Sequence, residues 1–434
     1  MPDKQKIDLS KIFDELWPLC RSITGEGLRQ SLKIIGNFIP LKINSVLSNT
    51  QIYDWKVPLE WKINDAKLVG PDGKTYADFK KSNLSIINYS VPVNKILNLD
   101  ELQKHLYSIP ELPDAIPYVT SYYKENWGFC LPDSVRKNLP SGSYHCHIDS
   151  ELFEGELNYS EYLLDGGKSN NEILLSSYLC HPSLANNELS GPLVMIGLYE
   201  KLKKLEHRRF NYRFFIGPET IGSLCFLNKR GVELKKNLKL GIVLTCLGGM
   251  NKNLSVKLPR DSKFFINDFI RKEKDLYIRE FTPIGGSDER QFCSPGFNLP
   301  VINISRDVYG KYSGYHNSLD TKEFMSIKSI EESVERIFSL ILKYENISPF
   351  YRSNPYGEPQ LGKRNLYPNL NSSKTWDSST DELKNSREML NSILWILSCS
   401  DGNTSLYEIS EKSGMKIERL QQSSRLLIQH NLIF

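Results

Sequence analysis

Two histidines stand in sequence surroundings that suit a metal site. His181 follows the apolar run NEILLSSYL and precedes a small polar loop, with Glu188 seven residues later. His316 lies in GYHNSLDT, a polar, glycine-containing loop in which an exposed side chain is expected. Zinc binds histidine nitrogen and carboxylate oxygen in proteins, and a catalytic zinc site keeps one position for water. The two loops therefore predict a metal site that activates water.

Acidic side chains follow apolar runs in two further loops. Glu219 lies in GPETIGS and Asp288 lies in GGSDERQF, and both loops contain glycine. A glutamate beside a metal-bound water can act as its general base. Structural alternatives remain open for each acid. Glu188 and Glu219 precede expected helices, where a carboxylate caps or favours the first turn, and Asp288 can orient His316 instead of binding metal.

The elements around these loops predict an α/β fold. Residues 155–345 alternate strands and helices, which is typical of a layered structure with a mostly parallel sheet. The expected strands are NEILLSSYL, YRFFIG, LKLGIVLTCLG and LPVINIS, and the expected helices are GPLVMIGLYEKLKKL, TIGSLCFLNKRG, KFFINDFIRKE and IKSIEESVERIFSLILKYEN. Ligands of such sheets bind at the carboxyl ends of the strands. Because His181, Glu219 and Thr245 follow strands, we expect their loops to converge.

The rest of the chain divides into segments of different character. Residues 7–42 have helical periodicity, and LKINSVLS then predicts a strand. From about residue 51 to 154, aromatic and β-branched residues predict a β-rich insertion. The last three expected helices, from residue 383, have helix-turn-helix spacing, and the segment that follows them suits the wing of a winged helix. The expected domains are a discontinuous α/β domain of residues 1–50 and 155–345, an inserted domain of residues 51–154, a linker of residues 346–382 and a winged-helix-like domain of residues 383–434.

Composition excludes several classes of function. A chain of 434 residues is too long for one ordinary core, and its net charge of +4 gives no strong attraction to nucleic acid or membrane. We expect no signal peptide and no membrane span. Eight scattered cysteines without a CxxC pair predict reduced thiols and a cytoplasmic location. Residues 375–434 carry eight acids and six bases, a net charge of −2, which favours protein contact or homo-oligomer formation over DNA binding.

The order of the polar motifs resembles that of the zinc aminopeptidase and carboxypeptidase clan. The matching motifs are ANNELSG (185–191), PETIGS (218–223), LTCLGG (244–249), GSDERQF (286–292) and YHNSLDT (315–321). The whole chain is similar to a bacterial family of aminopeptidase-like proteins, whose genes often lie near surface-polysaccharide genes. The segments CRSITGEGLRQSL and YDWKVPLEW and the helical tail also carry this resemblance. The resemblance implies a three-layer core, an inserted β domain over the site, a C-terminal winged helix and a small peptide or amide substrate.

The chain departs from the clan at positions that would bind metal. Asn187 stands at the bridging aspartate, Thr220 at a glutamate ligand and Thr245 at an aspartate ligand, and Tyr178 aligns with the first histidine unless the loop is shortened. A pair of metal ions needs a bridging carboxylate. The resemblance, with these departures, therefore implies one zinc ion.

The resemblance also implies a role for each candidate residue. The expected metal ligands are His181, His316 and a carboxylate, with Glu188 the first choice and Asp288 the second, and Glu219 is the expected general base. The expected substrate contacts are Arg290, Asn187 and Tyr315. Arg290 suits a substrate carboxylate or phosphate, and an internal salt bridge is its alternative.

Other functions compete with the hydrolase. The lost ligand positions favour a degenerate peptidase-like protein that binds a ligand without turnover, and the winged helix suggests a regulator. Cys180, with His316 near in space, suggests a thiol hydrolase. His145 and His147 lie on the same face of a strand and form a second candidate metal pair.

Overall fold

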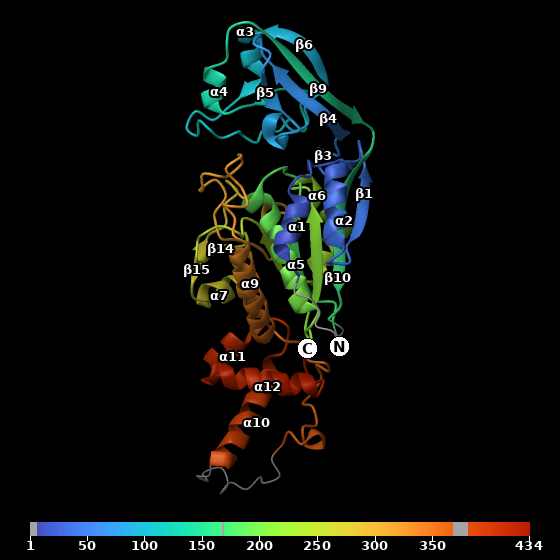
Figure 1. The fold of residues 1–434 in the computed structure, drawn as a ribbon. Helices are drawn as coiled ribbons and strands as arrows, with labels where there is room; N and C mark the ends of the chain where they lie inside the picture. The colour runs from blue at the N-terminus through green and yellow to red at the C-terminus, as the bar shows by residue number, and fades with distance from the viewer. Residues whose placement is uncertain (1–6, 167–168, 368–380) are drawn as a thin grey trace. The chain divides into compact units, whose positions relative to one another are not determined.

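The structure, a computed structural model, describes residues 7–166, 169–367 and 381–434. Its largest element is an eight-stranded sheet with the order β1-β10-β12-β11-β13-β16-β14-β15 (Figure 1). The strands are β1 Lys42–Leu47, β10 Glu156–Leu164, β11 Glu172–Tyr178, β12 Asn211–Gly217, β13 Leu238–Leu244, β14 Leu254–Lys257, β15 Leu276–Arg279 and β16 Val301–Ser305. The predicted α/β class is confirmed.

The middle of this sheet is parallel. Strand β11 pairs in parallel with β12 and β13, and β13 pairs in parallel with β16, whereas β1, β10 and β14 form antiparallel pairs. Every residue of β11 and β12 is buried, as expected for strands covered on both faces. The carboxyl ends of β11, β12 and β13 therefore meet at one edge of the sheet, where their loops can form a site.

Two helices connect the central strands. α5 (Ser190–Leu202) leads from β11 to β12, and α6 (Ile221–Asn237) leads from β12 to β13 in the opposite direction. Because such crossovers are right-handed, the two helices cover opposite faces of the sheet. Gly191 allows α5 to approach closely, since a Cβ there would lie 2.3 Å from Ser177 Oγ and 2.4 Å from Leu244 O.

The inserted segment between β1 and β10 builds its own four-stranded sheet, with the order β5-β4-β9-β6. Its strands are β4 Glu60–Val69, β5 Thr75–Asp78, β6 Val93–Asn98 and β9 Ser143–Phe153, and the short elements around them are β2 Gln51–Ile52, β3 Trp55–Lys56, β7 Leu106–Tyr107, β8 Phe129–Cys130, α3 Leu99–Leu102 and α4 Asp133–Lys137. The segment is rich in β structure, while its predicted boundaries stay a prediction.

Two parts of the first half differ from expectation. The predicted helix over residues 7–42 is two helices, α1 (Leu9–Leu16) and α2 (Glu26–Gly36), separated by a loop. Pro18 lacks a backbone N–H, and Gly25 has a φ of 96°, so neither continues a helix. Strands β14 and β15 extend the sheet although no strand was expected there. They have four residues each, too few for a clear alternating pattern.

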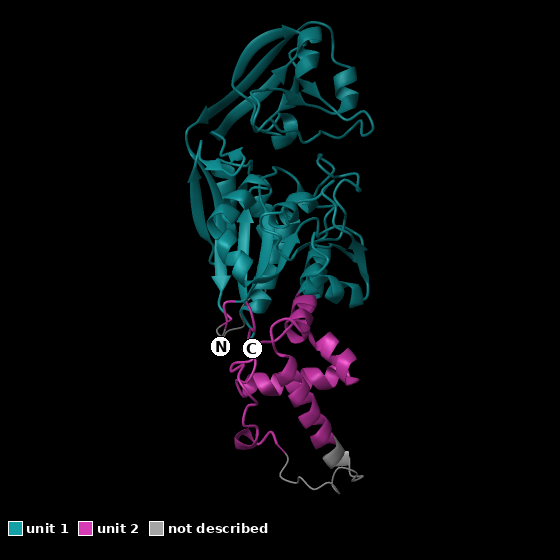
Figure 2. Cartoon of the chain, turned by 180° about the vertical axis from the view of Figure 1, so that it is seen from behind, with its two compact units in different colours: residues 1–165, 171–206, 211–337 teal, residues 166–170, 207–210, 338–434 magenta. Residues whose placement is uncertain are grey.

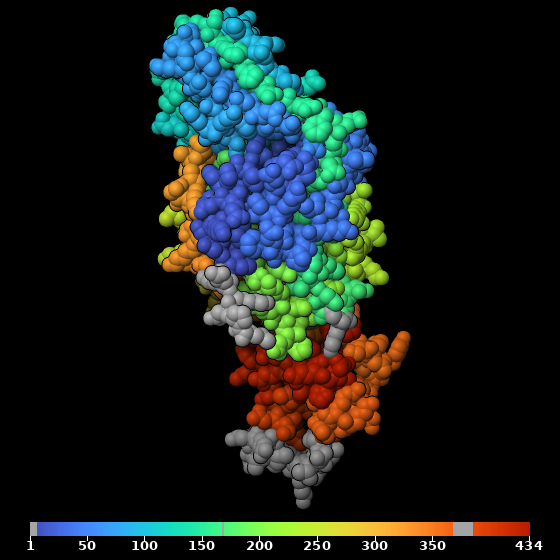
Figure 3. All heavy atoms as spheres, turned by 45° about the vertical axis from the view of Figure 1, so that its right-hand side comes forward, coloured from blue at the N-terminus to red at the C-terminus, as the bar shows by residue number. Residues whose placement is uncertain are grey.

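The described chain forms two compact units (Figure 2). The first comprises residues 1–165, 171–206 and 211–337, and the second comprises residues 166–170, 207–210 and 338–434. The first unit also contains α7 (Phe265–Lys272), α8 (Glu289–Phe292) and the start of α9 (Ile327–Ile347). The N-terminal helices, dark blue in Figure 3, lie at the surface of this unit.

The second unit ends in the three predicted helices, α10 (Asp381–Cys399), α11 (Leu406–Ser413) and α12 (Ile417–Gln429). Helix α11 begins with a capping box between Ser405 and Glu408 and ends at Gly414, whose φ is 70°. Residues 368–380 of the predicted linker lie outside the described residues. Among the helices that the structure describes, none is long and apolar enough to cross a membrane.

Candidate metal centre

His181 lies just beyond β11, and its ring contacts the loop that starts α5. Its Nδ1 lies 2.7 Å from Glu188 Oε2, a hydrogen-bond distance, and both side chains are buried. Glu188 belongs to the single helical turn Ala185–Leu189 before α5. The Asp320 carboxylate holds this turn, because it accepts hydrogen bonds from Asn186 N at 2.7 Å and Asn187 N at 2.8 Å. The sequence-adjacent loop thus presents a carboxylate to the histidine.

The other nitrogen of His181 faces a second carboxylate and a second imidazole. Its Nε2 lies 3.9 Å from Glu219 Oε2, and the ring centroids of His181 and His316 are 5.2 Å apart. Tyr315 stacks on His316 at a centroid distance of 3.9 Å. His316 has a φ of 56°, a conformation that non-glycine residues rarely adopt. Four predicted residues from three loops therefore meet in one site, in which His181 and Glu188 are buried and Glu219 and His316 are half-buried.

Glu219 is fixed by the GGSDERQF loop. Ser287 Oγ donates a hydrogen bond of 2.7 Å to Glu219 Oε1, and Thr220 N donates one of 2.7 Å to Asp288 Oδ1. Thr220 has a φ of 64°, so this strand-to-helix turn is strained and the Asp288 carboxylate helps to hold it. The structure thus places Asp288 in support of the Glu219 turn, and Ser287 is a site residue that the sequence did not single out.

Neither glutamate caps a helix. Helices α5 and α6 have no side-chain hydrogen bond at their N-caps, and the carboxylates of Glu188 and Glu219 are directed to His181 and Ser287 instead. The capping alternatives for these two residues are wrong, because each carboxylate is already engaged within the site.

Arg21 adds a buried positive charge beside Glu188 and was not among the residues predicted from the sequence. It lies in the loop between α1 and α2, is fully buried, and donates a hydrogen bond of 3.1 Å from Nε to His181 O. Its Nε also lies 3.8 Å from Glu188 Oε1. The only local signal was a charged residue within CRSIT, a segment predicted to be helical. Arg21 balances the buried Glu188 carboxylate from a position 160 residues away from His181 in the sequence.

We expect Arg21→Met to destabilise the fold strongly, since it leaves the Glu188 carboxylate buried without its cation. Breaking a buried ion pair typically costs about 3–5 kcal/mol. Urea denaturation of the wild type and the variant would measure the loss. Arg271→Met is the control, because Arg271 pairs with Glu280 at the surface and its loss should change little. Equal midpoints for wild type and Arg21→Met would contradict a buried pair at this site.

Burial and neighbouring charges shift the pKa values of four side chains at the site. Burial would lower the pKa of His181, but Cys180 and Glu188 together raise it well above its usual value. Burial and His181 lower the pKa of His316 to about 3. Burial raises the pKa of Glu219, and burial and Glu219 raise that of Asp288 to about 8. His316 is therefore neutral near pH 7, the form in which an imidazole binds metal, whereas the raised pKa of His181 means that it must release a proton when it binds an ion.

Three buried oxygen atoms at this site have no hydrogen-bond partner in the part of the chain that the structure describes. They are Glu188 Oε1, Asn187 Oδ1 and Asp288 Oδ2. Unpaired buried acceptors are costly unless a donor or a cation satisfies them. Ligand atoms of Cys180, His181 and Glu188 also lie within 4.8 Å of one another. Imidazole nitrogen and carboxylate oxygen beside unpaired acceptors fit a zinc ion.

The positions that would hold another ion in the clan are occupied differently. The Tyr178 hydroxyl donates to Asn187 O at 2.8 Å, accepts from Asn187 Nδ2 at 3.1 Å and lies 2.6 Å from Thr245 Oγ1. These three side chains form a hydrogen-bonded cluster without a carboxylate. The cluster fits the expectation of one ion.

The inserted segment contributes an aromatic side chain to the site. Tyr118 N donates to His316 O, and Ser318 N donates to Ile116 O, both at 2.9 Å. The Tyr118 ring lies edge-on at 4.9 Å from the His181 ring. The insertion thus pairs with the His316 loop and covers one side of the two imidazoles.

The predicted substrate contacts lie at the same site. Tyr315 stacks on His316, and Arg290 is half-buried with its Nε bonded to Ser287 O at 3.2 Å. Asn187 is buried and its amide nitrogen is already bonded to Tyr178.

The two competing cysteine and histidine sites gain less support. Cys180 Sγ lies 3.5 Å from His181 Nδ1, but burial raises the pKa of the thiol to about 11, so little nucleophilic thiolate is present near pH 7. The rings of His145 and His147 are 6.1 Å apart on the inserted sheet, and His145 Nε2 bonds Asn94 Oδ1.

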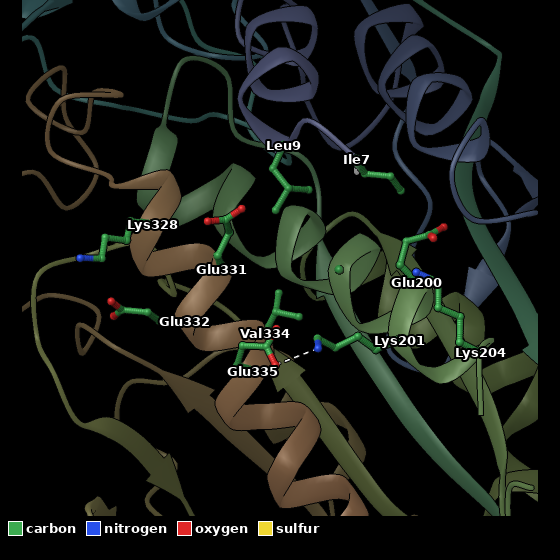
Figure 4. A pocket seen from close by; sticks show the side chains of 11 residues that line it. Ile7, Leu9, Glu200, Lys201, Lys204, Lys328, Glu331, Glu332, Val334 and Glu335 are labelled. Carbon is green, nitrogen blue, oxygen red and sulfur yellow. Dashed lines mark ion pairs between the residues drawn. The ribbon is translucent and has the colours of Figure 1, made fainter. Parts of the chain in front are cut away.

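A separate pocket of about 560 Å³ lies between α5 and α9 (Figure 4). Its lining mixes lysine and glutamate side chains, including an ion pair of 2.8 Å between Lys201 and Glu335. None of the predicted site residues lines it.

The fold and the C-terminal helices together define an aminopeptidase-like protein with a winged helix. The chain belongs to the family described as "Domain of unknown function (DUF4910)", whose profile matches residues 10–346. A profile described as "winged helix-turn-helix" matches residues 349–434. The resemblance drawn from the motifs is thereby confirmed.

Relatives agree with this assignment. The chain is 40% identical to a Clostridium acetobutylicum protein named "Putative polysaccharide biosynthesis protein with aminopeptidase-like domain", over 98% of this chain and 96% of the relative. A crystal structure of a "putative peptidase" from Clostridium acetobutylicum matches with a TM-score of 0.79 and 39% identity, over 98% of this chain and 95% of that one. BSAP, a zinc aminopeptidase from Bacillus subtilis, matches with a TM-score of 0.55 and 11% identity, over 78% of this chain and 95% of that one, and shows the fold alone.

Proposed function

We propose that this chain is a metal-dependent hydrolase that cleaves an amide bond in a peptide or in a polysaccharide-related substrate. One zinc ion would be held by His181 and His316, with Glu188 as the carboxylate that completes the site and Glu219 as the general base. The observation that carries the proposal is the pair of imidazoles, His181 buried and His316 half-buried, beside buried oxygen atoms that lack hydrogen-bond partners. The aminopeptidase-like fold and the name of the relative support the substrate class.

A zinc ion at such a site lowers the pKa of a bound water and polarises a carbonyl. Glu219 accepts the proton of the attacking water and delivers it to the leaving nitrogen. Ser287 fixes Oε1 of Glu219 and leaves Oε2 on the side of His181. Burial raises the pKa of Glu219, and a raised pKa makes a carboxylate a stronger base toward water.

Glu188 can act on the ion in two ways. Its Oε2 bonds His181 Nδ1 and so orients the ring, an arrangement common behind metal-binding histidines. Its Oε1 has no hydrogen-bond partner but lies 3.8 Å from Arg21 Nε, so it would bind the ion directly only by moving away from Arg21. Glu188→Gln distinguishes the two, because losing an orienting carboxylate lowers metal affinity about 10–100-fold and losing a ligand lowers it further.

Metal content tests the proposed function. Untagged protein purified without chelator should contain about one zinc or similar ion per chain, and treatment with a chelator should abolish hydrolysis of a peptide and amide panel. Re-addition of zinc should restore activity. Protein that stays free of metal after incubation with zinc would overturn the hydrolase and favour the binding protein without turnover. The cytoplasmic location and a homo-oligomer formed through the C-terminal unit stay predictions.

A further inference from the structure

Arg290 places a guanidinium group in the candidate site. It lies in α8, and its Nε donates to Ser287 O at 3.2 Å. Ser287 is also the residue whose hydroxyl holds Glu219 Oε1 at 2.7 Å. The same serine therefore anchors both the proposed general base and the arginine.

The acids next to Arg290 in the sequence are engaged elsewhere. Glu289 is fully buried, with Oε1 bonded to Lys257 Nζ at 2.9 Å and Oε2 bonded to Ser287 N at 2.9 Å. Asp288 accepts from Thr220 N at 2.7 Å. Arg290 makes no ion pair within 4.0 Å in the described ranges, and neither of its terminal nitrogens has a hydrogen bond there. The acids next to Arg290 in the sequence therefore form no ion pair with its guanidinium group.

A buried arginine of the first unit, Arg213, shows the contrast with the half-buried Arg290. Arg213 binds three carboxylates, those of Glu161, Glu172 and Glu233, at distances of 2.7–3.1 Å. These contacts make a structural ion-pair network. Arg290 has no such network in the part of the chain that the structure describes, where its Nε is bonded to Ser287 O.

The same site offers little to bind an ammonium group. Glu188 lies between His181 and Arg21, at 2.7 and 3.8 Å. Asp320 is bonded to the backbone of Asn186 and Asn187. Asp288 has one oxygen bonded to Thr220 N and one oxygen without a hydrogen-bond partner among the described residues. A substrate with a free amine beside its scissile bond would need an unengaged carboxylate. The charge available beside Glu219 is instead the cation of Arg290, whose planar fork matches a carboxylate bidentately.

We propose that Arg290 binds a carboxylate of the substrate, so that the substrate class is an amide with a free carboxylate next to the scissile bond, such as an N-acyl amino acid. This inference rests on the proposed hydrolase and names its substrate class. Arg290 determines which amides bind, and an amide with a free amine and no carboxylate is a poor substrate.

A matched pair of ligands tests this assignment. N-acetyl-L-methionine and N-acetyl-L-methioninamide differ only in the carboxylate, and their binding to zinc-loaded protein is measured by titration calorimetry beside their hydrolysis. The wild type should bind the carboxylate on the order of 100-fold more tightly. Arg290→Gln should reduce this preference to about threefold or less, with binding of the amide unchanged. Arg271→Gln, a surface variant, should retain the full preference.

Several results would overturn the inference. Equal binding of the two ligands by the wild type, no binding of either, or a preference that survives in Arg290→Gln would each do so. Inorganic phosphate that binds more tightly than N-acetyl-L-methionine, and in an Arg290-dependent manner, would replace the carboxylate by a phosphate. The proposed hydrolase fails separately, through absence of metal or of metal-dependent turnover. To separate the two, binding of the pair is also measured in protein that carries Glu219→Gln, which blocks turnover, with and without zinc.

Discussion

Glu219→Gln is expected to keep the metal and to lose about 10²–10⁴-fold in kcat, the usual contribution of a general base. Glutamine has the shape of glutamate and can still accept the hydrogen bond from Ser287 Oγ, so the local structure should persist. It cannot accept a proton from water. Metal content by elemental analysis, together with kcat for an amide that the wild type hydrolyses, measures the effect.

The control for this variant is Glu200→Gln, which changes a half-buried glutamate paired with Lys203 on α5 and should leave kcat unchanged. If Glu219→Gln loses the metal while Glu188→Gln keeps it, Glu219 is a ligand and the assignment of the base is wrong. The distance of 3.9 Å between Glu219 Oε2 and His181 Nε2 is longer than the roughly 3.3–3.5 Å between neighbouring ligand atoms of a tetrahedral zinc site. This distance favours the base.

His181→Ala and His316→Ala are each expected to lower zinc affinity by more than about 100-fold, beyond the effect of removing an orienting residue. The ring centroids of the two histidines are 5.2 Å apart, so each variant removes one of the two imidazole nitrogens of the proposed site. Zinc titration against a competing chelator gives the dissociation constants. Loss of zinc should also abolish turnover.

His145→Ala provides a matched control, because it removes a histidine of the exposed pair on the inserted sheet. Zinc content should not change. If the His145 variant loses zinc and the His181 variant retains it, the metal lies on the inserted sheet and the candidate centre is wrong. Thermal melting of all three variants shows whether any loss of zinc reflects unfolding.

In the proposed site, one ion would lie at His181, beside the positions at which the clan's ligands are missing. Tyr178, Asn187 and Thr245 occupy one side with hydrogen bonds among themselves. His181, displaced three residues beyond Tyr178, carries Glu188 on one nitrogen and faces Glu219 with the other. The cluster without a carboxylate and the candidate site thus lie next to each other, and metal titration decides whether the candidate site binds zinc.

The sequence by itself determined the α/β class, the order of the central elements and the loops that carry the site. Buried strands and amphipathic helices leave a local hydrophobic pattern, and polar residues after buried strands mark the edge where loops meet. His181, Glu219 and His316 were found in this way. The winged-helix tail was found from the spacing of its helices and the glycine between them.

Only the tertiary structure decided which groups contact which. Arg21 reaches His181 across 160 residues, and Ser287 reaches Glu219 across 68, so no local pattern records either contact. Burial and charge pairing at the site depend on all of these segments at once. Because the free energy of a buried charge is set by its neighbours in space rather than in sequence, the engaged roles of Glu188 and Asp288 and the unmatched Arg290 became visible only when the chain was folded.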